Sequence, residues 1–292
     1  MFNNLVIGVD GREGGHRAIA LAKQLAASGA VLTLANVYGA RMLPGRGAGI
    51  ALIWESEASE ALLERERESS GLPSANTLRS SEPSVGRGLH EIAEHVKADL
   101  LVIGSTHRER VARGIVVDDT ADVLHGAPCP VAIAPLHYDS AAPPTSVGVA
   151  CDGSAESLLA LAAGRVLAER FGAKLRVLAV VPVHVKPYWE RVPARSPEAN
   201  ETEARLAKVR ELRGVALEVL EGDPSDQLAQ SSEDLSLLIL GTRSQGAVRR
   251  VVAGSVATDL ALRCACPLLI WPRSAVPDAK TAAAAQVSNV QS

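Results

Sequence analysis

Short apolar runs alternate along this chain with longer segments in which apolar residues recur at helical spacing. Residues 5–9 and 146–151 are two such runs, and each is followed by a segment long enough to form a helix. Short apolar runs between turn residues are typical of buried parallel strands, whereas longer amphipathic segments are typical of helices that cover a sheet. The pattern therefore predicts an α/β protein.

The same pattern predicts five strands and four helices in each half of the chain. In the first half we expect strands at residues 5–9, 31–37, 76–78, 100–103 and 131–134, and helices at 15–28, 52–69, 85–96 and 120–125. In the second half we expect strands at residues 146–151, 174–181, 215–220, 235–240 and 267–271, and helices at 155–171, 198–212, 224–232 and 254–263.

The helix predicted over residues 155–171 has clear signals at both of its ends. Ser154 is placed to cap its first turn, and Gly172 is placed to end it. Five apolar residues share one face of this helix, which we expect to pack on the sheet: Leu158, Leu159, Ala162, Val166 and Leu167.

The two halves of the chain repeat one another at constant spacing. Gly104 and Gly241 each lie 26 residues before a proline that opens an apolar run, and the two glycines are 137 residues apart. Upstream, the run that ends at Asp10 matches the run that ends at Asp152 at an offset of 142, so one loop differs in length by five residues. Such regular spacing indicates two copies of one domain in tandem.

The repeat divides the chain into two domains of similar size. We expect a first domain over residues 1–138, a linker over 139–145 and a second domain over 146–273. The residues after 273 are rich in alanine and lack apolar periodicity, so we expect a disordered tail over 274–292. Within each domain, the alternation of strands and helices with right-handed crossovers predicts a doubly wound parallel sheet.

Such a sheet has a preferred place for ligands. They bind beyond the carboxyl ends of the strands, where the winding direction reverses. Here that point lies between the first and fourth strands, which end at Asp10 and Gly104 in the first copy and at Asp152 and Gly241 in the second. Each aspartate also suits the simpler role of capping the turn that follows it. The downstream loop favours a functional role for Asp152 and leaves the role of Asp10 open.

The loop after Gly241 has the residues that a phosphate site needs. Gly241, Ser244 and Gly254 are small, so backbone N–H groups can approach anionic oxygens. Gly254 and Ser255 open the next predicted helix, whose first N–H groups and whose Ser255 hydroxyl are placed to face phosphate.

These features resemble those of the universal stress protein family, in its tandem form. The resemblance rests on three motifs of the second copy: Asp152-Gly153 after the first strand, Gly241-x2-Ser244-x9-Gly254-Ser255 after the fourth, and Cys266-Pro267 before the fifth. It implies a Rossmann-like sheet of five parallel strands in the order 3-2-1-4-5 in each copy. It also implies ATP, with or without magnesium, as the cofactor.

The resemblance further implies which residues of the second copy hold ATP. Asp152 would contact the ribose, and the backbone at Val180 would contact the adenine. The phosphates would be lined by Leu240, Gly241, Ser244, Gly254, Ser255, Val256 and Ala257, and the site would also include Ala150, Cys151 and Arg243. Ser244 stands where the family has its second glycine, and a serine fits there more easily at negative than at positive φ.

The first copy departs from the family pattern in the same loop. His107 stands at the position of the second glycine, and Val117 and Asp118 stand at the Gly-Ser pair, followed by Asp119. Carboxylates at a helix start satisfy the helix dipole themselves and repel a polyphosphate, and Val117 adds bulk where the backbone must approach. We therefore predict that the first copy does not bind ATP in the family's manner.

Charge and composition argue against several other functions. The net charge of −3 provides no global positive field, so we expect no nucleic-acid partner. No stretch approaches the roughly 18 apolar residues of a membrane span, and the N-terminus lacks signal-peptide features, which predicts a cytoplasmic protein without a membrane partner. The four cysteines are expected to be small buried residues, and the seven histidines show no metal-ligand spacing, so no metal site is predicted.

The leading hypothesis is a stress-response protein that binds one ATP in its second copy and acts as a regulator. The chain contains no Gly-x-Ser-x-Gly elbow and no Walker A loop, and we assign no catalytic residues. Two alternatives stay open, an interaction scaffold that binds no nucleotide and a weak ATPase of the nucleotide-hydrolase type.

The family resemblance also bears on assembly. It implies that the fifth strands, at residues 131–134 and 267–271, pair within one chain and make the two copies an intramolecular pseudo-dimer. Association of two chains into a homodimer and docking of an unidentified protein partner are left open by the sequence.

Overall fold

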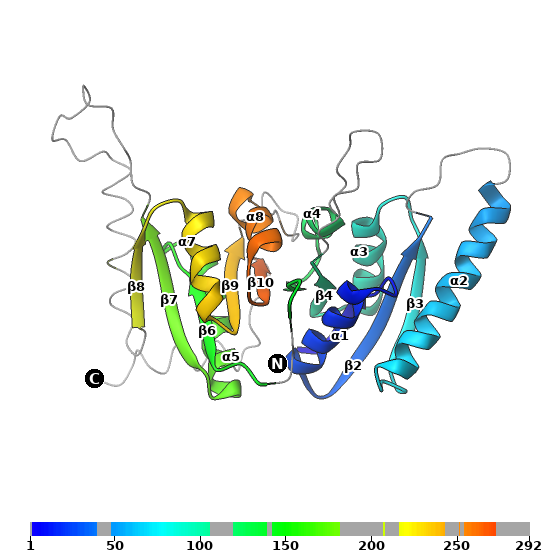
Figure 1. Cartoon of the computed structure of the whole chain (residues 1–292), viewed down its shortest axis with the longest axis horizontal. Helices are drawn as coiled ribbons and strands as arrows, with labels where there is room; N and C mark the ends of the chain where they lie inside the picture. Colours follow the sequence, from blue (N-terminus) through cyan, green and yellow to red (C-terminus); the bar gives the residue numbers. More distant parts are fainter. Residues whose placement is uncertain are drawn as a thin grey trace, which may run out of the picture.

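The computed structural model describes residues 2–39, 48–105, 119–138, 142–181, 207, 216–242, 251 and 254–272. These residues form a single ten-stranded sheet with helices on both of its faces (Figure 1). The predicted α/β class is therefore confirmed. No helix in the described part of the chain is both long enough and apolar enough to cross a membrane.

The first copy follows the predicted alternation of strands and helices. Its elements are β1 (Phe2–Gly8), α1 (Glu13–Leu25), β2 (Ala26–Tyr38), α2 (Ala48–Ser69), β3 (Asn76–Ser81), α3 (Val85–Val96), β4 (Leu100–Gly104), α4 (Asp119–Leu124) and β5 (Val131–Ala134). The bounds of α3 and β5 match the prediction at both ends. The helix predicted over residues 15–28 ends early, because the chain turns into β2 at Ala26, which pairs with Phe2 of β1.

The second copy has the same order of elements. They are β6 (Ser146–Ala150), α5 (Ala155–Phe171), β7 (Lys174–Val181), β8 (Ala216–Glu221), α7 (Pro224–Ser231), the short 3-10 helix η2 (Ser232–Asp234), β9 (Leu237–Thr242), α8 (Ser255–Arg263) and β10 (Leu268–Pro272). The bounds of α5 and β7 match the prediction. The helix predicted over residues 198–212, apart from Ala207, and the tail predicted over 274–292 lie outside the described residues.

The strand order is β3-β2-β1-β4-β5-β10-β9-β6-β7-β8, which is the predicted 3-2-1-4-5 order followed by its mirror sequence. Neighbouring strands are parallel except at the centre, where β5 and β10 are antiparallel. There Ala132 lies opposite Leu269, its own counterpart at the offset of 137, so a pseudo-twofold axis passes between these two residues. The predicted pairing of the fifth strands is therefore found within this one chain.

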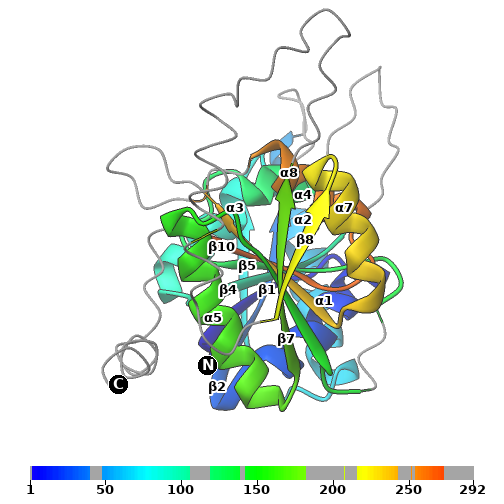
Figure 2. The ribbon, with the colours of Figure 1, turned by 90° about the vertical axis from the view of Figure 1, so that its left-hand side faces the viewer.

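The sheet twists strongly along its length. Figure 2 views it from the side of the second copy and shows β7 and β8 crossing the more distant central strands. This is the right-handed strand twist, accumulated over ten strands. One face is covered by α1, α2 and α5 and the other by α3, α4, α7 and α8, so the molecule has a hydrophobic core on each side of the sheet.

The α5 helix begins and ends as predicted, but the residues that are fully buried are mostly not the predicted ones. The Ser154 hydroxyl accepts a hydrogen bond from the Ser157 N–H, and Gly172 ends the helix at φ 62°. The buried residues are Ser157, Ala160, Leu161, Ala163, Gly164, Leu167 and Ala168; of the five predicted residues only Leu167 is fully buried, and Leu158 and Leu159 are partly buried against the same core. The physical reason is close packing: a Cβ on Gly164 would overlap the Val149 side chain of β6, so the helix lies close to the sheet at this point and its small residues are fully buried beside Leu161 and Leu167.

The glycines that end β4 and β9 have a packing role. A Cβ on Gly104 would overlap the backbone carbonyl of Gly14, at the start of α1. A Cβ on Gly241 would lie only 2.5 Å from the carbonyl oxygen of Glu156, in the first turn of α5. In both copies the helix that follows the first strand therefore presses its backbone against the end of the fourth strand.

We predict that Gly104→Ala lowers the free energy of unfolding by roughly 1–3 kcal/mol, because the added methyl group forces helix and strand apart. The matched control is Gly254→Ser, because nothing among the described residues lies within 4 Å of a Cβ there and the φ of −76° suits any residue. Serine is a favourable helix N-cap, so the control should change stability by less than about 0.5 kcal/mol. Urea denaturation checks both variants, and equal stability of the two would contradict the packing role.

Candidate functional site

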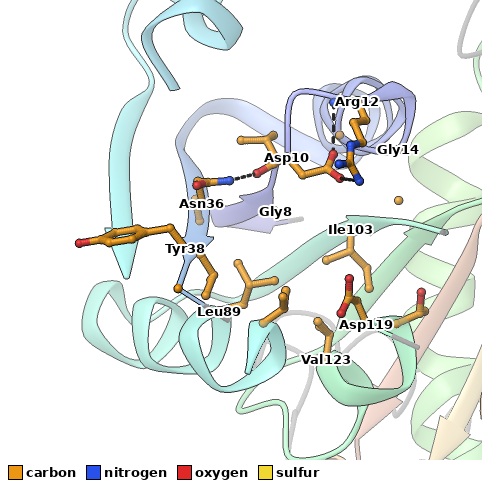
Figure 3. Close-up of a pocket in the computed structure, with 18 of the residues that line it drawn as sticks. Gly8, Asp10, Arg12, Gly14, Asn36, Tyr38, Leu89, Ile103, Asp119 and Val123 are labelled. Carbon is orange, nitrogen blue, oxygen red and sulfur yellow. Dashed lines mark hydrogen bonds and ion pairs between the residues drawn. The ribbon is translucent and has the colours of Figure 1, made fainter. Parts of the chain in front are cut away.

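A cavity of about 290 Å³ opens at the carboxyl ends of β1, β2 and β4 in the first copy (Figure 3). This is the predicted place, where the winding direction of the sheet reverses. The start of α1, Glu55 of α2, and residues of α3 and α4 complete the lining. The cavity therefore combines strand ends, helix starts and apolar helix faces around one space.

One side of the cavity is polar. Asp10 accepts a hydrogen bond from the Arg12 N–H at 3.2 Å, and the Arg12 guanidinium lies 3.8 Å from the other carboxylate oxygen of Asp10. The buried amide of Asn36 donates to the Val9 carbonyl at 2.6 Å and accepts from the Ser59 hydroxyl at 2.6 Å. These contacts fix the ends of β1 and β2 relative to each other and to α2.

The opposite side is apolar and ends at a carboxylate. Leu89 of α3, Ile103 of β4 and Val123 of α4 form the apolar wall, and Asp119 lies at its edge as the first residue of α4 (Figure 3). The other acidic residue in the first turn of α4, Asp122, instead accepts hydrogen bonds from the Ser84 hydroxyl and the Gly86 N–H at the start of α3.

The strand registers of the two copies agree, which allows their sites to be matched. Leu5 of β1 pairs with Leu100 of β4, and Val147 of β6 pairs with Leu237 of β9, as the offsets of 142 and 137 require. Eight of the twelve predicted ATP-site residues match positions that line the first-copy cavity: Ala150, Cys151, Asp152, Val180, Leu240, Gly241, Val256 and Ala257. Their counterparts are Gly8, Val9, Asp10, Val37, Ile103, Gly104, Asp119 and Thr120.

The other four predicted residues belong to the loop before α8 or to its start. Arg243 and Ser244 lie outside the described residues. Gly254 is the N-cap of α8 and provides no side-chain cap, and the first turn of this helix contains no acidic residue. Ser255 follows as an exposed residue. The start of α8 thus offers backbone N–H groups and no competing charge, as an anion site requires.

In the first copy, the loop that the sequence singled out is only partly described. His107, Val117 and Asp118 lie outside the described residues, and Asp119 begins α4. The prediction of an acidic helix start is therefore met at Asp119, and the rest of that prediction stays untested.

One polar residue near the predicted phosphate loop was missed by the sequence analysis. Thr242, directly after Gly241, is 4% exposed, and among the described residues its hydroxyl has no hydrogen-bond partner. Unpaired buried hydroxyls are costly, so this group is suited to a partner from outside the described residues. The only sequence signal was its place next to the loop glycine.

Asp152 has a local structural role in addition to any ligand contact. One of its carboxylate oxygens accepts a hydrogen bond from the Ser154 N–H at 3.0 Å, and Gly153 between them has φ 76°. Asp10 and Gly11 form the same turn in the first copy, with φ 71° at the glycine. The turn-capping interpretation of both aspartates is thus confirmed, and it holds each carboxylate at the end of its strand.

The loop before α8 is tied to the first copy. Val251 is buried and exchanges two backbone hydrogen bonds of 2.9 Å with the turn after α4, accepting from the Gly126 N–H and donating to the Ala127 carbonyl. The Ser105 hydroxyl, at the end of β4, donates to the Ala261 carbonyl of α8 at 3.2 Å. The predicted phosphate loop and the cavity-lining helix α4 are therefore joined through the centre of the molecule.

Comparison with known proteins was made for the whole chain. The model of the universal stress protein family matches residues 1–135 and again residues 145–272. The universal stress protein Rv2319c of Mycobacterium tuberculosis is 31% identical over 205 residues, which are 65% of this chain and 69% of that protein. The universal stress protein MJ0531 of Methanocaldococcus jannaschii is 30% identical over 132 residues, which are 41% of this chain and 76% of that protein.

Solved structures agree with the fold. A universal stress protein from Archaeoglobus fulgidus superimposes with a TM-score of 0.63 at 17% identity, covering 93% of this chain and 98% of its own. A putative universal stress protein from Pseudomonas aeruginosa superimposes with a TM-score of 0.55 at 18% identity, covering 99% of this chain and 98% of its own. At these identities the likeness concerns the arrangement of strands and helices.

The cysteines are buried thiols, as predicted. Burial raises the pKa of Cys129 to about 12, and burial also raises the pKa of Cys151 in the predicted site. The sulfurs of Cys264 and Cys266 lie 3.9 Å apart, and the hydrogen bond between them lowers the pKa of Cys264 while it raises that of Cys266. Among the described residues, no group of histidine, cysteine or acidic side chains is arranged to hold a metal ion.

We predict that Cys264 is alkylated before Cys129 when the native protein is treated with iodoacetamide at pH 8. The thiolate is the reactive form, and a pKa of about 12 leaves Cys129 ionised to only about one part in ten thousand at that pH. Peptide mass spectrometry over time measures both rates, with the urea-unfolded chain as control, in which the two thiols should react alike. Faster labelling of Cys129 in the native protein would contradict the assignment.

Proposed function

The chain belongs to the universal stress protein family, and from this premise we propose that it is a stress-response protein that binds one ATP in its second copy. In this proposal residues 1–138 and 146–273 are two domains of the family, joined by residues 139–145. ATP, alone or with magnesium, acts as a regulatory ligand, and its phosphates order the loop that leads into α8.

The start of α8 is the observation that carries the proposal. It follows β9 in the chain, and its counterpart α4 lines the first-copy cavity together with the end of β4, where a doubly wound sheet receives its ligands. Gly254 has room for a side chain and a backbone that tolerates one, so neither packing nor conformation among the described residues requires a glycine here. A glycine is instead useful where an anion must approach the first N–H groups of a helix.

Two further features support a phosphate at this position. The buried Thr242 hydroxyl has no partner among the described residues and lies on the same side of β9 as Leu240, which packs in the core that contains α8. Asp152 is held at the end of β6 by its own turn, at the position proposed to meet the ribose. The site therefore offers neutral donors for the phosphates and a carboxylate acceptor for hydroxyl groups.

The contrast between the copies supports a single nucleotide site. Where α8 has Val256, α4 has Asp119, and no acidic residue lies in the first turn of α8. A carboxylate at a helix start repels the anion that the helix dipole would attract. We therefore propose that ATP selects the second copy.

Two other functions compete with this proposal. In an interaction scaffold that binds no nucleotide, the start of α8 would have no ligand-binding role. Purified protein would then carry no nucleotide. A weak ATPase would release phosphate steadily, and a single substitution in the site would abolish that release.

We predict that Gly254→Asp weakens ATP binding by about tenfold or more relative to Gly254→Asn, because the added charge faces the phosphates. Aspartate and asparagine have the same shape and are both favourable helix N-caps, so the pair isolates charge from bulk and from folding. Isothermal titration calorimetry of the full chain measures both affinities. Thermal unfolding in the absence of ATP verifies that the two variants are equally folded.

The titrations distinguish a nucleotide site at the start of α8 from a site elsewhere and from a scaffold that binds no nucleotide. Equal affinity of wild type, Gly254→Asn and Gly254→Asp for ATP would place the nucleotide elsewhere. No heat of ATP binding to wild type, together with no nucleotide in the purified protein, would favour the scaffold.

A further inference from the structure

We propose that Cys264 and Cys266 form a disulfide when the protein meets a small peroxide, and that a dithiol reductant reopens it. The pair lies at the carboxyl end of α8, whereas the ATP site proposed above lies at the start of that helix. This modification site is therefore separate from the proposed nucleotide site.

The two thiols are already in contact. Their sulfur atoms lie 3.9 Å apart, and a disulfide requires them to approach to about 2 Å. Cys264 is the C-cap of α8, β10 begins at Leu268, and the chain bends at residues 265 and 266 between these elements. Because both sulfurs lie within one short turn, we expect side-chain rotation and a small adjustment of that turn to join them, without displacement of α8 or β10.

The turn that presents the two thiols is held by Ser232, at the end of α7. Its hydroxyl accepts a hydrogen bond from the Ala265 N–H at 2.9 Å and donates one to the Ala229 carbonyl at 2.6 Å. Ala265 is the residue between the two cysteines, so these bonds fix the turn at its middle. The thiols are thus held near each other before any oxidant arrives, which favours reaction between them over reaction with other thiols.

Burial limits the oxidants that can reach the pair. Cys264 is 9% exposed and Cys266 is 4% exposed, and both belong to the hydrophobic core that contains α8. A small neutral molecule such as hydrogen peroxide is suited to such narrow access, whereas a bulky or charged disulfide is not. We therefore assign a small peroxide as the oxidant.

The contact also divides the roles of the two thiols. The hydrogen bond between them lowers the pKa of Cys264 and raises that of Cys266, although burial opposes the ionisation of both. The thiolate is the form that attacks an oxidant. Cys264, which is also the more exposed of the two, is therefore the thiol that attacks the peroxide, and Cys266 is the thiol that closes the disulfide.

The oxidation takes place in two steps. The Cys264 thiolate attacks one oxygen of hydrogen peroxide, the O–O bond breaks, and the other oxygen leaves as hydroxide, which takes up the proton that Cys264 released. The Cys266 sulfur then attacks the sulfur of the Cys264 sulfenic acid, the S–O bond breaks, and a second water leaves with the Cys266 proton. Two thiols are oxidised to one disulfide, and one peroxide is reduced to two waters.

The product is expected to be reducible. A disulfide across a single intervening residue closes a small ring, and strained disulfides are the more easily reduced ones. A dithiol can therefore attack this bond, so that the dithiol is oxidised to a disulfide while Cys264 and Cys266 return to the thiol form.

The first copy shows that the fold does not require this pair. At the offset of 137, Cys129 matches Cys266, but Ala127 stands where the second copy has Cys264. Ala127 is fully buried, so an alanine fits this turn of the domain. The thiol of Cys264 is therefore an addition in the second copy, and Cys264→Ala is a change that the same turn already accommodates in the first.

The experiment treats the full chain with hydrogen peroxide and then blocks its free thiols with N-ethylmaleimide in urea. Trypsin releases both cysteines of the pair in one peptide, residues 264–273, and the other two cysteines in a second peptide, residues 114–165. Mass spectrometry is expected to show the first peptide unlabelled and lighter by two hydrogens than its dithiol form, before the second peptide is oxidised. Dithiothreitol added to the oxidised native protein should restore both labels.

Two variants test the pairing. In Cys264→Ala, Cys266 lacks its partner and should be oxidised by peroxide more slowly than in wild type, by about tenfold or more. Cys129→Ala removes the buried thiol that matches Cys266 in the first copy, and it should form the disulfide at the wild-type rate. Thermal unfolding verifies that both variants are folded.

Several results would overturn the proposal. They are an unchanged peptide 264–273, oxidation of Cys264 to a sulfinic acid without a disulfide, a crosslink between two chains, a disulfide that dithiothreitol does not reopen, and oxidation of Cys266 in Cys264→Ala at the wild-type rate. The ATP proposal is tested apart from it, because Cys264→Ala should bind ATP with the affinity of wild type and Gly254→Asp should still form the disulfide.

Discussion

The antiparallel pairing of β5 with β10 is the contact on which the whole architecture depends. Without it, each copy would end in an unpaired edge strand that exposes its backbone N–H and carbonyl groups. With it, two five-stranded sheets become one, and Ala132 and Leu269 lie opposite each other at a pseudo-twofold axis. A family fold that occurs twice in one chain thereby forms a single continuous ten-stranded sheet.

This pairing also brings the two candidate sites together. Because β4 and β9 flank the central pair, the helices that follow them meet near the axis, where α4 contacts α8. The backbone hydrogen bonds of Val251 with Gly126 and Ala127 reinforce that contact. The loop proposed to hold phosphate and the helix that lines the first-copy cavity thus share one interface, although their helix starts have different charge.

Glycines illustrate how one residue type serves two purposes in the same site. Gly241 was first interpreted as a position that allows phosphate to approach, but its neighbours show that packing against Glu156 already requires a glycine. Gly254 has no such requirement among the described residues, so its identity is the stronger sign of a ligand. The difference is visible only when the surroundings of each glycine are known.

The sequence by itself determined the tandem repeat and the bounds of elements such as α3 and α5, because periodicity and capping residues are local, whereas the strand order was implied by the resemblance to the family. It also identified the edge of each sheet where ligands are expected, because the predicted strand positions fix where the carboxyl ends of the first and fourth strands lie. It did not determine which residues of α5 are fully buried or where α1 stops, because these depend on how closely a helix approaches a strand and on pairing with Phe2. Only the tertiary structure decided that the first copy has a formed cavity, that Thr242 is buried without a described partner, and that Val251 ties the copies together. Each of these depends on contacts between residues far apart in the chain, which no local pattern records.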